Sequence, residues 1–291
     1  MENFQLISNY KNNDAYRANF NELAKNIFGI QFEDWYQQGF WNERYIPYSF
    51  VDGEKVIANV SINLFDIILH GKHVNGLQVG TVMTHPDYRN RGLSAKLLKK
   101  VFEDFDDTCD FMYLFANQSV LEFYPKFGFR SYKESLFEIE VHGGQNKLGT
   151  KLNPLNSKDL KFIYEFVKRR VPVSSEFGIT HGEDVFMFHA MYGFPDDIYY
   201  FAEENAIVIY QVQEDILHLF DVISDRLVSL QSLISKLAPS NVKKAVLHFT
   251  PNDNEYKVNP IPYEPSDVFF IRTKKDIQLP TYVKHPITSQ A

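Results

Sequence analysis

Cysteine is nearly absent from this sequence, since Cys109 is the single cysteine among 291 residues. One cysteine excludes a disulfide within the chain and disfavours a zinc site built on cysteine thiolates. Cys109 stands shortly before the apolar run FMYLFA. We therefore interpret it as a residue that packs between a helix and a strand, not as a catalytic nucleophile.

Long apolar runs are missing as well. No window approaches the roughly 20 apolar residues that a membrane-spanning helix needs. The first residues, MENFQLISNYKNNDAYR, do not place a basic segment before an apolar one, so they do not indicate a signal peptide. The sequence therefore predicts a cytoplasmic protein without a membrane partner.

The sequence also lacks a surplus of positive charge. The formal net charge is -7, whereas general nucleic-acid binders need excess Lys and Arg to displace counterions from phosphates. We therefore expect no nucleic-acid partner. Hydrophobic residues make up 44% and charged residues 23%, which is ordinary for a globular protein, and the length suffices for two domains.

Two familiar phosphate-binding loops are also absent. No GxGxxG follows a predicted strand, and no GxxxxGK[ST] occurs, which excludes a Rossmann dinucleotide site and a P-loop. A different segment has the properties of an anion site: HPDYRNRGLSAKLLKK, residues 85–100, follows the strand-like run LQVGTVMT. It enters a helix expected from Gly92 to Asp104, and the unpaired N–H groups of a helix N-terminus bind anions. Arg89 and Arg91 add positive charge there, so the segment predicts a phosphate cradle.

The remaining periodicity of the first half predicts mixed helices and strands. Helices are expected over 13–30 and 32–40, followed by consecutive strands over 45–84 that turn at Asp52-Gly53, Gly71-Lys72 and Asn75-Gly76. A buried strand over 110–116, a short helix over 119–127 and one strand over 129–141 complete this half. The polar, glycine-containing stretch HGGQNKLG, residues 142–149, is the predicted linker.

The second half repeats this order of elements. It begins with a helix capped by Ser157 and a second helix, continues with three strands, and ends with a helix and two further strands. Local similarity supports the repeat, for example YSFVDGEKVIA against YYFAEENAIVI. We predict an internal duplication with units at 1–142 and 150–291. The alternative is a pair of unrelated α/β domains.

Two motifs resemble those of the GCN5-related N-acetyltransferase (GNAT) superfamily. Arg89, Gly92 and Ser94 occupy the key positions of its motif A, where the last residue is usually Gly or Ala. The segment ANQSVLEFYPKFGF is similar to motif B. Its matching residues are Asn117, Tyr124, Lys126, Gly128 and Phe129. The resemblance covers residues 1 to about 142, and it implies a GNAT fold of the α/β (α+β) class. In that fold a mixed, mostly antiparallel central sheet is flanked by helices, here duplicated in tandem.

The resemblance also implies acetyl-CoA as co-substrate, with no metal. The residues that it places at the coenzyme are Val82, Met83, Thr84, Arg89, Asn90, Arg91, Gly92, Leu93, Ser94 and Asn117. A backbone N–H near Val82 or Met83 would meet the thioester carbonyl, where preorganised donors matter most. Tyr124 would assist the leaving thiolate, because a thiol of pKa about 8.5 leaves easily and a Tyr of pKa about 10 then suffices to help it.

Many members of the family place a Glu on the strand before the loop, whereas this sequence offers only Gln78. A base acting through water is then sought among Glu33, Asp34, His73 and His85. The predicted acceptor residues are Trp35, Tyr36, Trp41 and Glu43, together with Gln78. This cluster fits a pocket for a cationic amine, and packing between domains is the alternative interpretation.

These observations predict an acetyl-CoA-dependent N-acetyltransferase that acts on a primary amine of a small molecule or peptide. The alternatives are a sensor that binds acyl-CoA without turnover, and an aminoacyl or other acyl transferase on the same tandem fold. The second half has ISDRLVSLQSLI in place of the loop, so we expect no coenzyme there; it would shape the acceptor pocket or mediate a homodimer. Tandem relatives of the enhanced-intracellular-survival type use a C-terminal carboxylate in catalysis, and the sequence alone does not carry that role over to Ala291.

Overall fold

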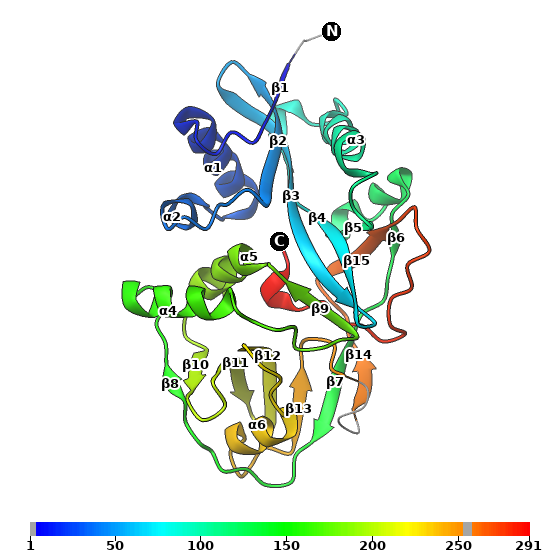
Figure 1. The fold of residues 1–291 in the computed structure, drawn as a ribbon. Coiled ribbons are helices and arrows are strands. Elements are labelled where there is room, and N and C mark those ends of the chain that lie inside the picture. The colour runs from blue at the N-terminus through cyan, green and yellow to red at the C-terminus, as the bar shows by residue number, and fades with distance from the viewer. Residues whose placement is uncertain (1–3, 253–257) are drawn as a thin grey trace.

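Two mixed β-sheets, each flanked by helices, make up the fold (Figure 1). The structure is a computed structural model, and it describes residues 4–252 and 258–291. The predicted fold class is confirmed by this arrangement. Among the described residues no helix is long and apolar enough to cross a membrane.

The first sheet has the strand order β1-β2-β3-β4-β5-β15-β6, with β9 added to β3. Among its described strands, only β4 and β5 pair in parallel. Its strands are β1 (Gln5–Ser8), β2 (Tyr45–Asp52), β3 (Lys55–Leu69), β4 (Lys72–Thr84), β5 (Phe111–Asn117), β6 (Arg130–Ser131), β9 (Phe177–Thr180) and β15 (Asp267–Arg272). Its helices are α1 (Asp14–Phe28), α2 (Glu33–Gln37) and α3 (Leu93–Phe105).

The second sheet has the order β14-β7-β13-β12-β11-β10-β8, and of the strands that the structure describes here only β12 and β13 are parallel. Its strands are β7 (Ser135–Glu140), β8 (Thr150–Lys151), β10 (Ile198–Phe201), β11 (Ala206–Gln213), β12 (Ile216–Ser224), β13 (Lys244–Leu247) and β14 (Asn259–Pro262). Its helices are α4 (Ser157–Val167), α5 (Glu183–Phe188) with the π-helical turn η4 (His189–Gly193), and α6 (Leu230–Leu237). In both sheets one helix, α3 or α6, connects the parallel pair, and this repeat fits the predicted duplication.

The two sheets exchange one strand each. β7 precedes the predicted linker but lies between β13 and β14 of the second sheet, while β15 returns to lie between β5 and β6 of the first. Burial explains the exchange, because Phe137 packs in the core of the second sheet and Phe269 in that of the first. The unit boundaries at 142 and 150 stay a prediction, but the sheets are not divided there. The single strand predicted over 129–141 is wrong, since β6 and β7 belong to different sheets.

Three local predictions need correction. The turn predicted at Asn75-Gly76 lies inside β4, where a Cβ on Gly76 would collide with Ile67, so this glycine serves close packing. The helix predicted over 119–127 is two 3-10 turns, η2 (Gln118–Val120) and η3 (Tyr124–Phe127), since proline disrupts a helix interior. The cap of α4 is Asn156, whose side chain accepts from the first-turn N–H groups.

The last described residues, 283–291, return to the junction of the two sheets, where Figure 1 shows them in red. Lys284 forms an ion pair of 2.9 Å with Glu134, and both side chains are buried. Thr288 Oγ1 donates to Asp221 Oδ2 at 2.5 Å, and Asp221 also pairs with Arg170 at 2.7 Å. Hydrogen bonds from both halves of the chain therefore fix this segment beside the pocket described below.

Candidate functional site

The parallel strands β4 and β5 separate partway along their length. They pair only from Gly76 and Phe111 to Val79 and Leu114, and beyond this point a gap opens between them. The pairing of β4 with β3 shifts its register there, and Thr81 adopts φ 47, in the left-handed region. The Asn59 side chain supports this bulge by donating from Nδ2 to Thr81 O at 2.8 Å. A bulge re-aims the strand, so the gap is a built feature of the fold.

The loop after β4 leads into α3 through a glycine. Gly92 is the N-cap of α3 with φ 70, and no side chain caps this helix. The first-turn N–H groups are therefore open to a ligand, as anion sites require. Two contacts fasten the loop to β4: Ser94 Oγ lies 2.8 Å from Thr84 Oγ1, and Arg89 Nε donates to Thr84 O at 3.3 Å.

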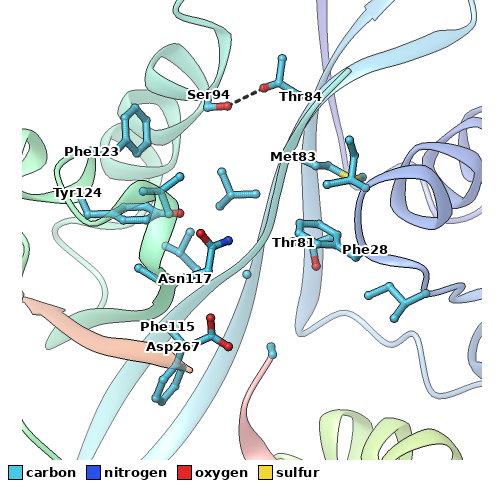
Figure 2. A pocket seen from close by; sticks show the side chains of 18 of the residues that line it. Phe28, Thr81, Met83, Thr84, Ser94, Phe115, Asn117, Phe123, Tyr124 and Asp267 are labelled. Carbon is cyan, nitrogen blue, oxygen red and sulfur yellow. Dashed lines mark hydrogen bonds between the residues drawn. The ribbon is translucent and has the colours of Figure 1, made fainter. Parts of the chain in front are cut away.

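A pocket of about 940 Å³ runs from this loop through the gap between the strands (Figure 2). Every residue predicted at the coenzyme lines it, from Val82 to Ser94, and so do Asn117 and Tyr124. On the far side of β4 one part of the pocket is lined by apolar side chains, and we term this part with its lining the apolar arm. It consists of Ile27, Phe28, Ile30, Phe32, Trp35, Tyr45, Val185 and Phe188.

Tyr124 and Asn117 face this pocket from β5 and the turns after it (Figure 2). Burial raises the pKa of Tyr124 to about 12, so its phenol stays neutral and able to donate a proton near neutral pH. Asn117 Oδ1 accepts from the backbone N–H of Ser119 at 3.0 Å and from its hydroxyl at 2.6 Å. These bonds orient the amide and leave its Nδ2 donor for a ligand.

The aromatic residues of the predicted acceptor cluster pack against one another, but the cluster does not line the pocket as a group. Trp35 lines the pocket, with its Nε1 donating to Asp184 O at 2.8 Å, but the other members do not. Trp41 is buried in the aromatic core, and Arg17 Cζ lies 3.9 Å from the centre of the Tyr36 ring. Glu43 is exposed and pairs with Lys11 at 2.6 Å. Packing, the alternative interpretation, accounts for Tyr36 and Trp41.

Gln78 is fully buried and holds the segment 287–291. Its Nε2 donates to Ser289 O at 3.1 Å, and its Oε1 accepts from the backbone N–H of Ala291. On the opposite side, His189 Nε2 lies 2.6 Å from Gln290 O. The backbone of Ala291 borders the pocket so closely that a Cβ on Gly80 would lie 3.2 Å from its carbonyl carbon. Gln78 therefore positions a wall of the pocket and does not line the pocket itself.

None of the four residues considered as a base lines the pocket: Glu33, Asp34, His73 and His85. Glu33, for example, is engaged by Arg17 at 3.0 Å. Asp267 is the one side-chain carboxylate among the described lining residues, and Figure 2 shows it pointing into the pocket beneath Asn117. Sequence reasoning missed Asp267, because β15 reaches the first sheet only through the strand exchange. Its place at the start of an apolar strand was the only local signal.

The corresponding region of the second sheet is closed. The loop from β12 to α6 borders a cavity of only about 20 Å³, which includes Arg226 in its lining. The N-terminus of α6 is capped by Ser229, whose side chain accepts from the Ser232 N–H. Among the described residues no group of three or more His, Cys, Asp or Glu is arranged to hold a metal ion.

Residues 11–131 match the family model described as an acetyltransferase (GNAT) domain. No curated protein sequence matches the chain. Among similar solved structures is a probable N-acyltransferase from Enterococcus faecalis V583, a conserved protein of unknown function (15% identity, 93% of this chain and 73% of that one, TM-score 0.57). A second is a GCN5-related N-acetyltransferase from Kribbella flavida (15%, 93% and 72%, TM-score 0.56). A third is Eis1 from Mycobacterium abscessus (12%, 93% and 73%, TM-score 0.58). At such identities the similarity concerns the fold alone.

Proposed function

Because the chain belongs to the GNAT superfamily of acyltransferases, through the domain matched at residues 11–131, we propose that it transfers an acetyl group from acetyl-CoA to a primary amine. The amine attacks the thioester directly while both substrates are bound. The observation that carries this proposal is the pocket, which joins the open N-terminus of α3 to the apolar arm through the gap between β4 and β5.

The loop residues 89–94 hold the pyrophosphate of the coenzyme. The uncapped first turn of α3 supplies N–H donors, and Arg89 and Arg91 line the same end of the pocket with positive charge. Gly92 allows close approach, since its left-handed φ suits glycine and no other atom occupies the space where a Cβ would lie. Asn117 binds the pantetheine from the other side of the gap, with its Nδ2 as donor.

The backbone of β4 meets the thioester carbonyl. His85 N–H donates to Ile57 O at 2.8 Å, and N–H groups alternate in direction along a strand. The N–H groups of Val82 and Thr84 therefore face away from β3, toward the gap, and Met83 does not. Of the two residues considered for this role, Val82 is the one supported. Its N–H would stabilise the negative charge that develops on the carbonyl oxygen.

Tyr124 donates its proton to the departing thiolate. Its buried phenol stays protonated because burial raises its pKa to about 12. A thiol of pKa about 8.5 is a good leaving group, so Tyr124 needs only to share its proton with the sulfur as the S–C bond breaks. The amine reacts in its neutral form, and the proton that its nitrogen loses after the N–C bond has formed returns Tyr124 to the neutral phenol. An acetyl-enzyme on cysteine has no support, since Cys109 does not line the pocket.

A sensor of acyl-CoA without turnover is the second candidate. It is favoured by the presence of Gln78, an amide, where many members of the family have a Glu, which leaves the strand before the loop without a proton acceptor at that position. Turnover separates the two candidates. Purified protein is incubated with acetyl-CoA and each of several amines, and mass spectrometry measures the acetylated amine.

The proposal predicts an acetylated product that the Tyr124→Phe variant forms about 100-fold more slowly, in the range for a lost general acid. Acetyl-CoA binding by calorimetry is the control, and it should be the same in both proteins. Tight acetyl-CoA binding without product from any amine would instead support the sensor.

A further inference from the structure

The pocket is chemically divided, and its apolar arm limits which amine can enter. The open part of this arm is formed by Ile27, Phe28, Ile30 and Phe188, and Phe28 remains 41% exposed at the rim. Large exposed apolar side chains at the mouth of a pocket indicate an apolar ligand. Figure 2 shows Phe28 across β4 from Tyr124, so the arm begins where the reacting amine must lie.

Few charged side chains line the pocket. Asp267 is the single side-chain carboxylate among the described lining residues, and the cations Arg89 and Arg91 belong to the loop. Asp267 pairs with Asn117 in the register of β15 and β5, so it lies beside the predicted position of the pantetheine. An ammonium group placed there would have one opposite charge as its partner. A second ammonium further along the arm would lose its hydration among apolar side chains and find no second side-chain carboxylate among the described lining residues, which is costly.

We propose that the acceptor is a monoamine with an apolar, aromatic-sized body, such as an arylalkylamine, whose ammonium meets Asp267 and whose body fills the apolar arm. This inference rests on the proposed acetyl transfer. It disfavours polyamines, which carry several charges, and amino acids, because no Lys or Arg side chain lines the apolar arm to pair with a carboxylate.

The two tryptophans provide a direct readout of binding. Trp35 and Trp41 are the only tryptophans of the sequence, their rings lie 6.0 Å apart, and Trp35 lines the pocket. Phenethylamine and spermidine are titrated separately into the wild-type protein in the presence of coenzyme A, and tryptophan fluorescence is followed. The kcat/KM of acetyl transfer is then measured for both amines.

The expected result is an affinity and a kcat/KM at least about 10-fold higher for phenethylamine, since burying a phenyl group against apolar walls is worth this factor or more. Phe28→Ser should lower the affinity for phenethylamine by about 10-fold, and Asp267→Asn should lower it by a similar factor. The matched controls are Phe162→Ser, a similarly exposed phenylalanine outside the pocket, and Asp107→Asn, a fully exposed aspartate. Both controls should behave as wild type.

The outcomes separate this inference from the proposed function. Acetylation of spermidine or an amino acid in preference to phenethylamine would overturn the inference and leave acetyl transfer standing. Binding of phenethylamine that Phe28→Ser abolishes, without any turnover, would support the ligand class and refute the transfer. No fluorescence response to phenethylamine would overturn the inference.

Discussion

Gln78 holds the backbone of Ala291 across 213 positions of sequence: its side-chain oxygen accepts from the Ala291 N–H. The same amide donates to Ser289 O at 3.1 Å. Since Ala291 borders the pocket, a strand residue of the first sheet fixes a wall that is supplied by the far end of the chain. The site is therefore complete only when the segment 287–291 is docked.

Replacing Gln78 tests this dependence. Gln78→Leu removes both hydrogen bonds and leaves buried backbone groups of Ser289 and Ala291 unpaired, which costs about 1–3 kcal/mol each. We expect a lower free energy of unfolding in urea and a raised KM for the amine, with the affinity for acetyl-CoA unchanged. Gln37→Leu, on an exposed face of α2, is the control. An unchanged KM for the amine in Gln78→Leu would show that the wall is not needed.

Gly92 tests the coenzyme loop, and the chain offers a matched control. Gly92 and Gly53 have similar φ values, 70 and 62, and open space surrounds both. Gly92→Glu and Gly53→Glu should therefore carry a similar backbone cost of about 1–2 kcal/mol. Only Gly92→Glu also places a carboxylate where we expect the pyrophosphate.

Calorimetry should show acetyl-CoA binding lost in Gly92→Glu and kept in Gly53→Glu. Equal binding by the two variants would refute the loop as the coenzyme site.

Tyr124 should produce a distinctive pH dependence. Burial raises its pKa to about 12, above the ordinary value of about 10. The phenol then remains a proton donor throughout the range from about pH 7 to about pH 10. The rate ratio of wild type to Tyr124→Phe should therefore be constant over this range. A ratio that falls toward one as the pH approaches about 10 would indicate an ordinary phenol or a different acid.

His285 should make the folded state sensitive to acid. Burial, reinforced by the charge of Lys284, lowers the pKa of His285 to about 3, whereas an unfolded histidine has a pKa of about 6.5. A depressed pKa means that the unfolded chain binds the proton first. The stability that the neutral, buried His285 contributes is therefore fully present above about pH 6.5, and it is lost as the pH falls toward about 3. Lowering the pH to about 5 should reduce the free energy of unfolding by about 2 kcal/mol through the protonation of His285 in the unfolded chain.

Urea unfolding at several pH values measures this slope. The slope of the unfolding free energy with pH reports how many protons are taken up on unfolding. In His285→Gln this number should be smaller by about one, although the variant is less stable overall. His142→Gln is the control, because the His142 side chain is 87% exposed to solvent. The same slope in His285→Gln and wild type would mean that other groups, such as His248, whose pKa burial also lowers to about 3, account for the acid sensitivity.

Local sequence was sufficient for those parts of the site that lie within a few residues of one another. The loop from Arg89 to Ser94 and the turn that carries Tyr124 are contiguous motifs, and the structure places both at one pocket. Their roles are set by strand ends and helix ends, which local patterns predict well.

The remainder depends on contacts that no local pattern encodes. Asp267 and Ala291 reach the pocket from the end of the chain, one by strand exchange and one through the bonds of Gln78. Trp35 and Trp41 lie close in sequence, yet only Trp35 faces the pocket. Which aromatic side chains become walls and which become core follows from the packing of α1, α2 and α5 together, so the sequence could indicate the cluster but not divide it.

The central claim is that the pocket between β4 and β5 transfers an acetyl group to an amine. The most direct measurement is the initial rate of free thiol release from acetyl-CoA by the wild-type protein, without an amine and with each of several amines, phenethylamine and spermidine among them. The account predicts release that requires an amine and saturates with it. Release at the same rate without an amine, or no release with any amine despite bound acetyl-CoA, would contradict it.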